Sequence, residues 1–124
     1  MNLLLDTRVA LWALARPFEL SSEVRGRIVE SPRVCVSAVS AWELVHKAAL
    51  GHLQPVEGFA GASRAAGFEE LSLSFAHAEA ARALPVQDGD PFDRLLAAQA
   101  LVEGLTLVTA DPRMRAYKVP LLVV

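Results

Sequence analysis

Short apolar runs alternate with longer helix-forming segments along the whole chain, and this alternation limits the possible folds more than any other feature of the sequence. Runs such as 2–5 and 34–37 are too short for a helix, and their continuous apolar character is typical of strands buried on both faces. The runs that we expect to form strands are 2–5, 34–37, 68–73, 106–109 and 119–124. The alternation predicts an α/β fold, in which helices cover both faces of a parallel sheet.

The segments between these runs contain helix formers and end at proline or glycine. The clearest prediction is a helix over 91–103, because Asp90 is suited to cap its start, Pro91 to occupy its first turn and Gly104 to end it. A polar loop, 85–90, precedes this helix. The other segments for which we expect helices or helical turns are 9–15, 23–30, 40–50, 56–66, 75–84 and 111–117.

Length and cysteine content indicate one domain in a reducing compartment. The chain has 124 residues, and we treat 1–124 as a single domain. Cys35 is its only cysteine, which excludes a disulfide scaffold or a zinc finger. No apolar stretch reaches the roughly 18 residues of a membrane span, and the first residues lack the basic region of a signal peptide. We therefore expect a cytoplasmic protein with no membrane partner.

The composition indicates a partner chain and gives no sign of a basic nucleic-acid-binding domain. The net charge is −2, with 12 basic and 14 acidic residues, whereas nucleic-acid-binding domains are usually basic. Any activity on nucleic acid must therefore depend on a local site. Hydrophobic residues make up 53% of the chain, slightly above the usual ~45–50%. Large hydrophobic side chains near Trp12, Leu14, Trp42 and Leu50 favour an additional buried surface, which we expect in a homodimer.

Four acidic residues occupy positions where functional groups gather in α/β proteins. Asp6 and Asp111 directly follow expected strands, Glu43 begins the helix after the second strand, and Asp93 opens the helix 91–103. Ligands of open α/β sheets bind outside the carboxyl ends of the strands. Each acid also has a structural interpretation: Asp6 as a helix N-cap, Glu43 in a capping box with Ser40, Asp93 as a partner of the helix dipole and Asp111 as a turn former.

Taken together, the four acids predict a cation site. Two carboxylates ~4 Å apart at an effective dielectric constant of ~20 repel each other by about 4 kcal/mol before screening. A divalent ion with oxygen ligands removes this repulsion, and Mg²⁺ binds through one or two carboxylates, water and substrate phosphate. Such a site can activate water and stabilise the leaving oxygen of a phosphodiester. We assign Asp6 and Asp93 as metal ligands, with Glu43 and Asp111 completing the catalytic pocket.

Other common catalytic arrangements are absent from the sequence. The histidines His46, His52 and His77 lack a shared metal-binding spacing, and no serine stands in a Gly-x-Ser-x-Gly motif. There is also no glycine-rich phosphate loop. These absences exclude the common histidine-zinc, serine-hydrolase and P-loop motifs.

Four motifs in order along the chain resemble those of the PIN-domain ribonucleases, and among these the VapC-type toxins of toxin–antitoxin pairs. The first is Leu-Leu-Leu-Asp-Thr at 3–7, followed by Leu-Trp at 11–12. The second is Val-Ser-Ala-Val-Ser-Ala-Trp-Glu at 36–43. The third and fourth are Asp-Pro-Phe-Asp-Arg-Leu-Leu-Ala-Ala-Gln-Ala at 90–100 and Leu-Thr-Leu-Val-Thr-Ala-Asp at 105–111.

The resemblance implies a PIN-like domain with a central parallel five-stranded sheet, a Mg²⁺ or Mn²⁺ ion, endonucleolytic cleavage of RNA and a cognate antitoxin protein. It assigns the family's acids to Asp6, Glu43, Asp93 and Asp111. Thr7 is then a helper near the metal, and Asp90 is either an accessory acid or only the helix cap. Two positions depart from such sequences: Arg8 stands where histidine is frequent, and Asp88-Gly89 where His-Arg is frequent. Both departures bear on the choice of substrate.

Basic residues and two other classes of function complete the predictions. Arg94, Arg113 and Arg115 either hold RNA phosphates or are solvated surface charges. The first alternative function is a Mg²⁺-binding phosphoacceptor signalling domain, which would need paired acids after the first strand and a lysine after a late strand; Lys118 has no obvious place in such a site. The second is a non-catalytic acidic pocket that docks a basic segment. For the nuclease, we expect a groove that accepts an amphipathic antitoxin helix, with a basic side chain reaching Asp6 and Asp93.

Overall fold

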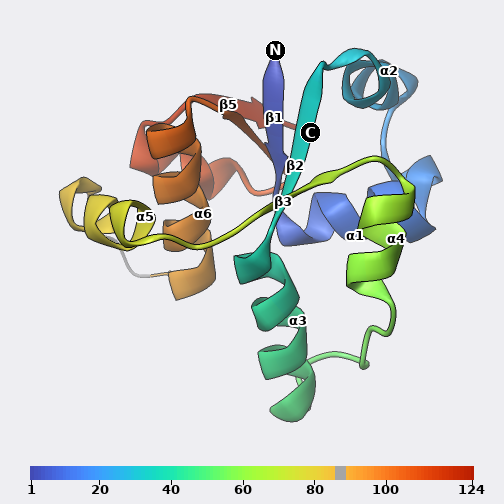
Figure 1. Ribbon diagram of the computed structural model, residues 1–124, viewed down its shortest axis with the longest axis horizontal. Helices are drawn as coiled ribbons and strands as arrows, with labels where there is room; N and C mark the ends of the chain where they lie inside the picture. The colour runs from blue at the N-terminus through green and yellow to red at the C-terminus, as the bar shows by residue number, and fades with distance from the viewer. Residues whose placement is uncertain (86–88) are drawn as a thin grey trace.

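A five-stranded parallel sheet forms the centre of the molecule, with strand order β3-β2-β1-β4-β5. The computed structural model describes residues 1–85 and 89–124. Figure 1 shows α5 and α6 on one side of the sheet and α1, α2 and α4 on the other, while α3 projects away from the end of β2. The strands are β1 (Asn2–Leu5), β2 (Arg33–Ser37), β3 (Glu69–Leu71), β4 (Thr106–Thr109) and β5 (Leu121–Val123).

Six α-helices and three short 3₁₀-helices connect these strands in the described residues. The α-helices are α1 (Thr7–Ala15), α2 (Ser22–Glu30), α3 (Ala38–Ala49), α4 (Phe59–Ala65), α5 (Phe75–Ala80) and α6 (Pro91–Glu103). The 3₁₀-helices are η1 (Pro17–Glu19), η2 (Ala81–Ala83) and η3 (Pro112–Tyr117). Among the described residues, none of the helices combines the length and the hydropathy that crossing a bilayer requires.

The predicted fold class and the five parallel strands are confirmed. The helix predicted over 91–103 has these bounds in the structure, with Asp90 as its N-cap and Gly104 ending it at φ 67°. The segment expected as one helix over 75–84 is shorter, because α5 tightens into η2 after Ala80. The helix expected over 56–66 begins only at Phe59, after Gly58 at φ 71°. Part of the expected loop 85–90, including Asp88, lies outside the described residues.

The alternative interpretation of Glu43, as the partner of Ser40 in a capping box, is wrong. The helix α3 begins at Ala38, and its N-cap is Ser37, whose side chain accepts a hydrogen bond from the N–H of Val39. Ser40 therefore lies inside the first turn, and its hydroxyl lies 2.8 Å from Oγ1 of Thr7. Glu43 lies one turn farther along the helix, where it has no capping role.

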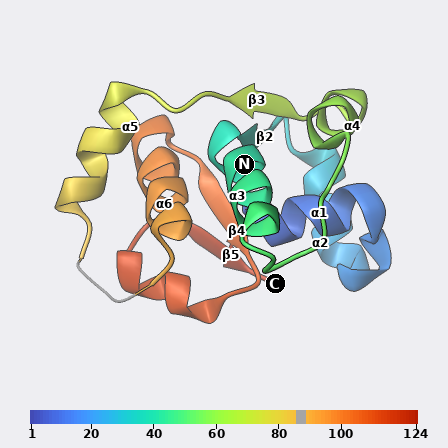
Figure 2. The same cartoon turned by 90° about the horizontal axis from the view of Figure 1, so that it is seen from below.

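The core consists of two layers that meet the sheet from opposite sides. Leu4 of β1 and Leu107 of β4 pack with α6 and η3, whereas Leu3 and Leu5 face the layer of α1 and α2. Because side chains alternate along a strand, each buried strand supplies both layers. Figure 2 shows β3 crossing the molecule between α4 and α5, so that this edge of the sheet joins the two layers. The sheet is therefore covered on both faces, as predicted.

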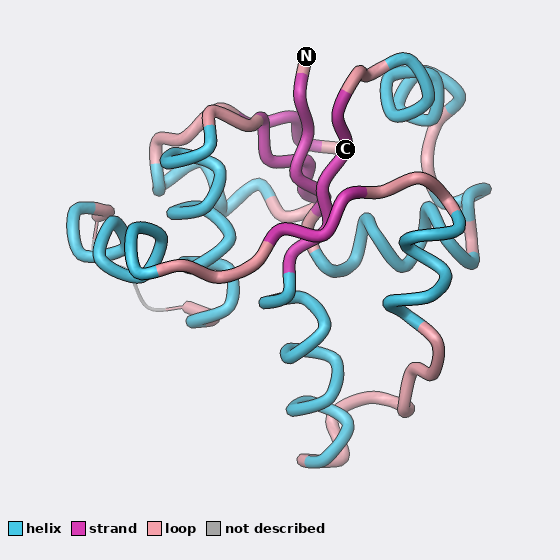
Figure 3. Tube along the Cα trace, viewed as in Figure 1, coloured by secondary structure: helices cyan, strands magenta, loops and turns pink. Residues whose placement is uncertain are grey.

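The topology brings three strand ends together. The strands β2, β1 and β4 lie side by side and run in parallel, so their carboxyl ends share one edge. The helices α1 and α3 and the 3₁₀-helix η3 all start there, and Figure 3 shows helices leaving the strand ends after short connections. This edge is where α/β proteins bind ligands.

A buried polar network fixes α3 against α6. The side chain of Gln99 on α6 is fully buried. Its Oε1 accepts a hydrogen bond from the hydroxyl of Ser37 at 2.5 Å, and its amide nitrogen lies 3.4 Å from Nδ1 of His77. The imidazole of His77 lies 2.8 Å from the carboxylate of Glu103 through Nε2. Because Ser37 also caps α3, Gln99 links the start of the helix that carries Glu43 to the helix that carries Asp93.

We predict that Gln99→Leu lowers the free energy of unfolding by about 1–3 kcal/mol, because Ser37 loses its acceptor in a buried position. Urea unfolding followed by circular dichroism measures this change. The control is Val102→Ala on the same helix, since Val102 is 42% exposed and its truncation should cost less than about 0.5 kcal/mol. Equal stability of Gln99→Leu and the wild-type protein would contradict the role of the network.

Candidate active site

An acidic cleft of about 720 Å³ opens at the shared edge of the strands. All four acids assigned from the sequence line this cleft, and so do Thr7 and Asp90. Basic side chains also enter it, from Arg8 on α1, Lys47 on α3 and Arg113 on η3. The described lining residues are Asp6, Thr7, Arg8, Glu43, Lys47, Gly89, Asp90, Asp93, Ala110, Asp111, Pro112, Arg113, Met114, Ala116 and Tyr117.

Asp6 is positioned by the turn from β1 into α1. Its backbone N–H donates to the carbonyl of Val108 on β4 at 2.9 Å, and its carboxylate caps α1 by accepting the N–H of Val9 at 2.8 Å. The residue is buried. Burial raises the pKa of Asp6 above its ordinary value, although hydrogen bonds from Thr109 and Val9 act in the opposite direction. Asp6 is thus both a helix cap and a carboxylate in the cleft.

Asp93 lies in the first turn of α6, where Asp90 and Pro91 fix the start of the helix. Burial is the largest influence on this carboxyl group, and the negative charges of Asp90, Glu43 and Asp6 add to it. Together these effects raise the pKa of Asp93 from 3.8 to about 7. A carboxylic acid with such a pKa binds a cation readily in exchange for its proton.

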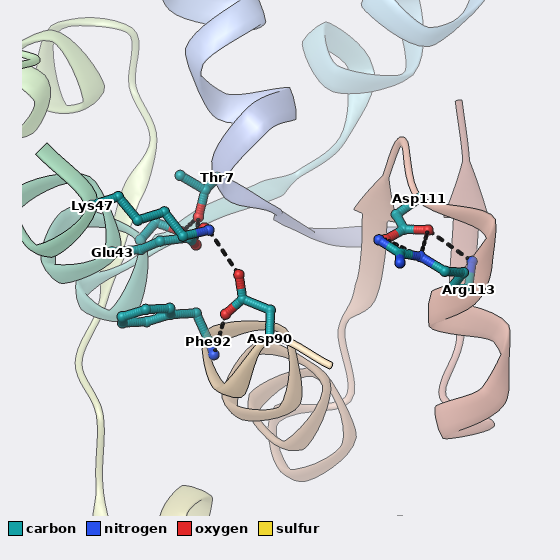
Figure 4. Close-up of polar contacts among 8 residues, drawn as sticks. Thr7, Glu43, Lys47, Asp90, Phe92, Asp111 and Arg113 are labelled. Carbon is teal, nitrogen blue, oxygen red and sulfur yellow. Dashed lines mark hydrogen bonds and ion pairs between the residues drawn. The ribbon is translucent and has the colours of Figure 1, made fainter. Parts of the chain in front are cut away.

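Glu43 and Asp90 are held by a common lysine (Figure 4). Nζ of Lys47 lies 2.5 Å from Oε2 of Glu43 and 2.7 Å from Oδ2 of Asp90. The other oxygen of Glu43 accepts a hydrogen bond from the hydroxyl of Thr7 at 2.6 Å. The other oxygen of Asp90 accepts the N–H of Phe92 at 2.8 Å. The network therefore joins α1, α3 and the start of α6.

Asp111 forms a separate group on the other side of the close-up in Figure 4. Its carboxylate caps η3 by accepting the N–H of Arg113, and the guanidinium of the same arginine donates to both carboxylate oxygens at 2.9–3.1 Å. The hydrogen bonds from Arg113 hold the pKa of Asp111 below its ordinary value. The side chain of Arg113 is 87% exposed, so the pair can open at little cost.

Arg94 does not point into the cleft as a phosphate ligand. Its guanidinium donates to the backbone carbonyls of Ala81, Leu84 and Pro85 at 2.7–2.9 Å. Arg94 thus closes the end of η2, and it is absent from the described lining of the cleft. Arg115 is exposed and also lies outside this lining. Of the three arginines singled out in the sequence, only Arg113 lines the cleft.

The sequence analysis did not identify Lys47 as a residue of the site. Its spacing of four residues from Glu43 places both side chains on one face of α3 and predicts an ordinary surface ion pair. The second partner, Asp90, is 43 residues away. Helix periodicity therefore predicts the contact of Lys47 with Glu43, whereas its contact with Asp90 follows only from the tertiary structure.

The acids share the cleft, but they do not converge on one point. Among the described residues, no three His, Cys, Asp or Glu side chains are close enough to hold one ion. The assignment of Asp6 and Asp93 as the two metal ligands needs no such convergence, and it stays a prediction. Within the described part of the chain, Asp6 and Asp93 also have no basic partner at ion-pair distance, whereas Glu43, Asp90 and Asp111 do. The cleft thus contains two different sets of acids.

The fold and the cleft define an α/β protein with acidic groups at the carboxyl edge of a parallel sheet, and the comparisons identify its family. The sequence profile of the PIN domain matches residues 3–120. Ribonuclease VapC22 of Mycobacterium tuberculosis is 34% identical over 123 residues, which cover 96% of this chain and 94% of that protein. The chain belongs to the PIN domain family, and the resemblance inferred from the sequence motifs is confirmed.

Solved structures share this fold. VapBC2 from Rickettsia felis, bound to a DNA fragment from its promoter, matches with a TM-score of 0.69 at 16% identity, covering 99% of this chain and 98% of that chain. DNA-bound VapBC from Salmonella typhimurium also gives a TM-score of 0.69, at 20% identity over 99% of this chain and 98% of the other. These likenesses establish the arrangement of the sheet and helices.

We predict that the metal-free protein becomes less stable as the pH rises from 5 towards 8. The folded protein holds a proton on Asp93 up to a pKa of about 7, whereas the unfolded chain releases it near ~4. The folded state therefore binds more protons in this interval, and its stability falls with rising pH. Thermal unfolding in EDTA should show a shallower fall for Asp93→Asn.

The matched control is Glu79→Gln, which removes an exposed carboxylate on α5 outside the described lining of the cleft. This variant should keep the slope of the wild-type protein. A wild-type melting temperature that does not fall relative to Asp93→Asn over this pH range would contradict the raised pKa of Asp93.

Proposed function

We propose that the chain is a metal-dependent endoribonuclease and the toxin of a type II toxin–antitoxin pair, acting on RNA in the cytoplasm. The observation that carries this proposal is the division of the acids in the cleft. Three carboxylates have basic partners, whereas Asp6 and Asp93 have none among the described residues and have raised pKa values. Two acids that lack counterions in a cleft are suited to a divalent cation.

The available donors fit Mg²⁺ or Mn²⁺. All candidate ligands are carboxylate oxygens, which these ions prefer over nitrogen or sulfur. Because no three such groups converge among the described residues, the protein supplies two carboxylates, from Asp6 and Asp93, and leaves the remaining positions to water and substrate oxygens. When bound, the ion polarises the scissile phosphate and lowers the pKa of water.

The other residues of the cleft have positioning roles. Thr7 and Lys47 hold the two oxygens of Glu43 from opposite sides. This fixed carboxylate is suited to orient an attacking water. Asp111 faces the cleft from η3 and, once Arg113 turns towards a phosphate, it can contribute to the pocket as a second acid. Arg8, in the place where related sequences often have histidine, adds a positive charge for RNA.

Two observations favour the nuclease over the two alternative functions. A phosphoacceptor domain needs a lysine after a late strand, but the lysine of the cleft, Lys47, is on α3 and is engaged with Glu43 and Asp90. A purely docking pocket does not account for membership of the PIN family or for the likeness to a protein named as a ribonuclease.

We predict that Asp6→Asn and Asp93→Asn each abolish RNA cleavage. The loss should exceed the roughly 10–100-fold that partners of metal ligands contribute. Both variants should remain folded, with melting temperatures in EDTA at or above that of the wild-type protein, because each removes a repulsive charge. Cleavage of a labelled RNA with added Mg²⁺ or Mn²⁺ measures the effect, and Glu79→Gln is the control.

The proposal fails if the wild-type protein cleaves RNA in excess EDTA. It also fails if either asparagine variant, shown to be folded, cleaves at the wild-type rate.

The partners in this proposal are a cognate antitoxin and a second copy of the chain. The neighbours of known structure are VapBC assemblies. A basic side chain of an antitoxin would neutralise Asp6 and Asp93 and exclude the metal. Trp42 and Val45 on α3 and Leu50 at its C-cap are 55–59% exposed, and large apolar side chains gathered at one helix favour an interface. We assign this surface to the homodimer.

We predict that the chain alone is a dimer at micromolar concentration, with twice its mass of 13.3 kDa in light scattering. Trp42→Ser should give a folded monomer, whereas Val29→Ser on α2, at a residue 84% exposed, should not.

The product of the neighbouring antitoxin gene should copurify with the chain and inhibit RNA cleavage. Neutralising its basic residues should relieve the inhibition. A wild-type monomer would contradict the dimer. Inhibition that persists after the basic residues of the antitoxin are neutralised would contradict the proposed mode of inhibition.

A further inference from the structure

The ammonium group of Lys47 lies in the acidic cleft. In the active sites of some other nucleases, a second divalent ion supplies the positive charge among the acids. Two-metal sites place their ions roughly 3.5–4 Å apart, so that both the attacking and the leaving oxygen are stabilised. In this chain, Nζ of Lys47 lies between Glu43 and Asp90, at 2.5 and 2.7 Å. Its side chain is 29% exposed, and the ring of Phe92 lies 5.7 Å from Nζ. The ammonium is therefore enclosed by two acids and an aromatic ring.

Both oxygens of both acids are already engaged. Glu43 uses one oxygen for Thr7 and the other for Lys47. Asp90 uses one oxygen for the N–H of Phe92 and the other for Lys47. While Lys47 is in place, neither carboxylate has an oxygen without a hydrogen-bond donor. A divalent ion at this position would have to displace the ammonium.

The charge of the cleft leads to the same conclusion by an independent route. Among the described residues that line it, five are acidic and three are basic. With all of them ionised, these described residues carry two negative charges in excess, which one divalent ion balances. A second divalent ion would leave the cleft positive unless Lys47 or an arginine moved out of it.

We propose that Lys47 is a built-in substitute for a second metal ion, so that each chain binds a single divalent cation at Asp6 and Asp93. This inference rests on the proposed metal-dependent function. Lys47 is a positioning residue: its ammonium pairs with Glu43 and Asp90 and holds both carboxylates in place, and it does not touch the reacting phosphate. Since the ammonium is part of the chain, the position between Glu43 and Asp90 holds a positive charge at any concentration of Mg²⁺.

The stoichiometry of Mn²⁺ binding tests the proposal without any measurement of cleavage. Metal-free protein is titrated with MnCl₂ by isothermal calorimetry, and free Mn²⁺ is counted by electron paramagnetic resonance. The wild-type protein should bind one Mn²⁺ per chain. Lys47→Met, which keeps the length of the side chain and removes its charge, should bind two, because Glu43 and Asp90 become available.

Three controls separate the charge of Lys47 from its position and from general effects. Lys47→Arg keeps a cation and should bind one Mn²⁺. Lys118→Met removes the chain's other lysine, which is exposed and outside the described lining of the cleft, and should also bind one. The double variant Lys47→Met with Asp90→Asn removes an acid of the second position and should return to one. This variant also relieves the repulsion that Lys47→Met creates, so it should fold at least as well as the single variant.

Each result decides the question. Two Mn²⁺ ions on the wild-type chain, or one on folded Lys47→Met, overturn the proposal. If Lys47→Met does not fold, the same titration is made on Lys47→Gln, which also removes the charge: two ions on this variant support the proposal, and one ion overturns it. Failure of the proposed function is distinguishable, because the wild-type chain would then bind no Mn²⁺ at all. If Lys47 were only a clamp between α3 and α6, Lys47→Met would melt at a lower temperature and still bind one ion.

Discussion

Repulsion between carboxylates at the carboxyl edge of the sheet is the interaction on which the rest of this structure depends. The strands β2, β1 and β4 are adjacent and parallel, so acids placed after them cannot avoid one another. The chain reduces the repulsion in three ways: Lys47 lies between Glu43 and Asp90, Arg113 covers Asp111, and Asp93 retains a proton up to a pKa of about 7. Among the described residues, Asp6 and Asp93 are then the acids of the cleft whose negative charges no basic side chain at ion-pair distance balances.

Helix capping explains how the fold tolerates so many acids in one place. Asp6, Asp90 and Asp111 each accept a backbone N–H at the start of a helix, where the helix dipole and free N–H groups stabilise an anion. The structural and functional interpretations of these residues are therefore compatible. In each case a carboxylate oxygen accepts the backbone N–H at the start of the helix, and the residue also lines the cleft. Glu43 differs, because it has no capping role and depends on Thr7 and Lys47.

Sequence patterns predicted the elements whose signals are local. The strands β1 and β4 and the helix α6 were predicted with their bounds because apolar runs, Pro91 and Gly104 act within a few residues. The predicted start of α3 was two residues too late because Ser37 and Ser40 are both suitable caps, and only the hydrogen bond from the N–H of Val39 identifies Ser37 as the one used. Lys47 and Arg94 could not be assigned, since their partners are a distant carboxylate and the carbonyls that end η2. Side chains that bridge elements depend on tertiary contacts that no local pattern contains.

Under the proposed function, the charge of the cleft also links the binding of substrate to inhibition. The proposed substrate, RNA, is a polyanion, and the two excess negative charges on the described lining of the cleft, counted with every group ionised, repel it until a divalent ion is bound. Loading of the ion and entry of RNA are therefore coupled through the same two charges. An inhibitor competes by supplying these charges from another source. One basic side chain provides only one of them, and a proton on Asp93, whose pKa is raised to about 7, provides the other. A single arginine therefore balances the described acids of the cleft only when Asp93 also carries a proton, whereas one divalent ion supplies both charges.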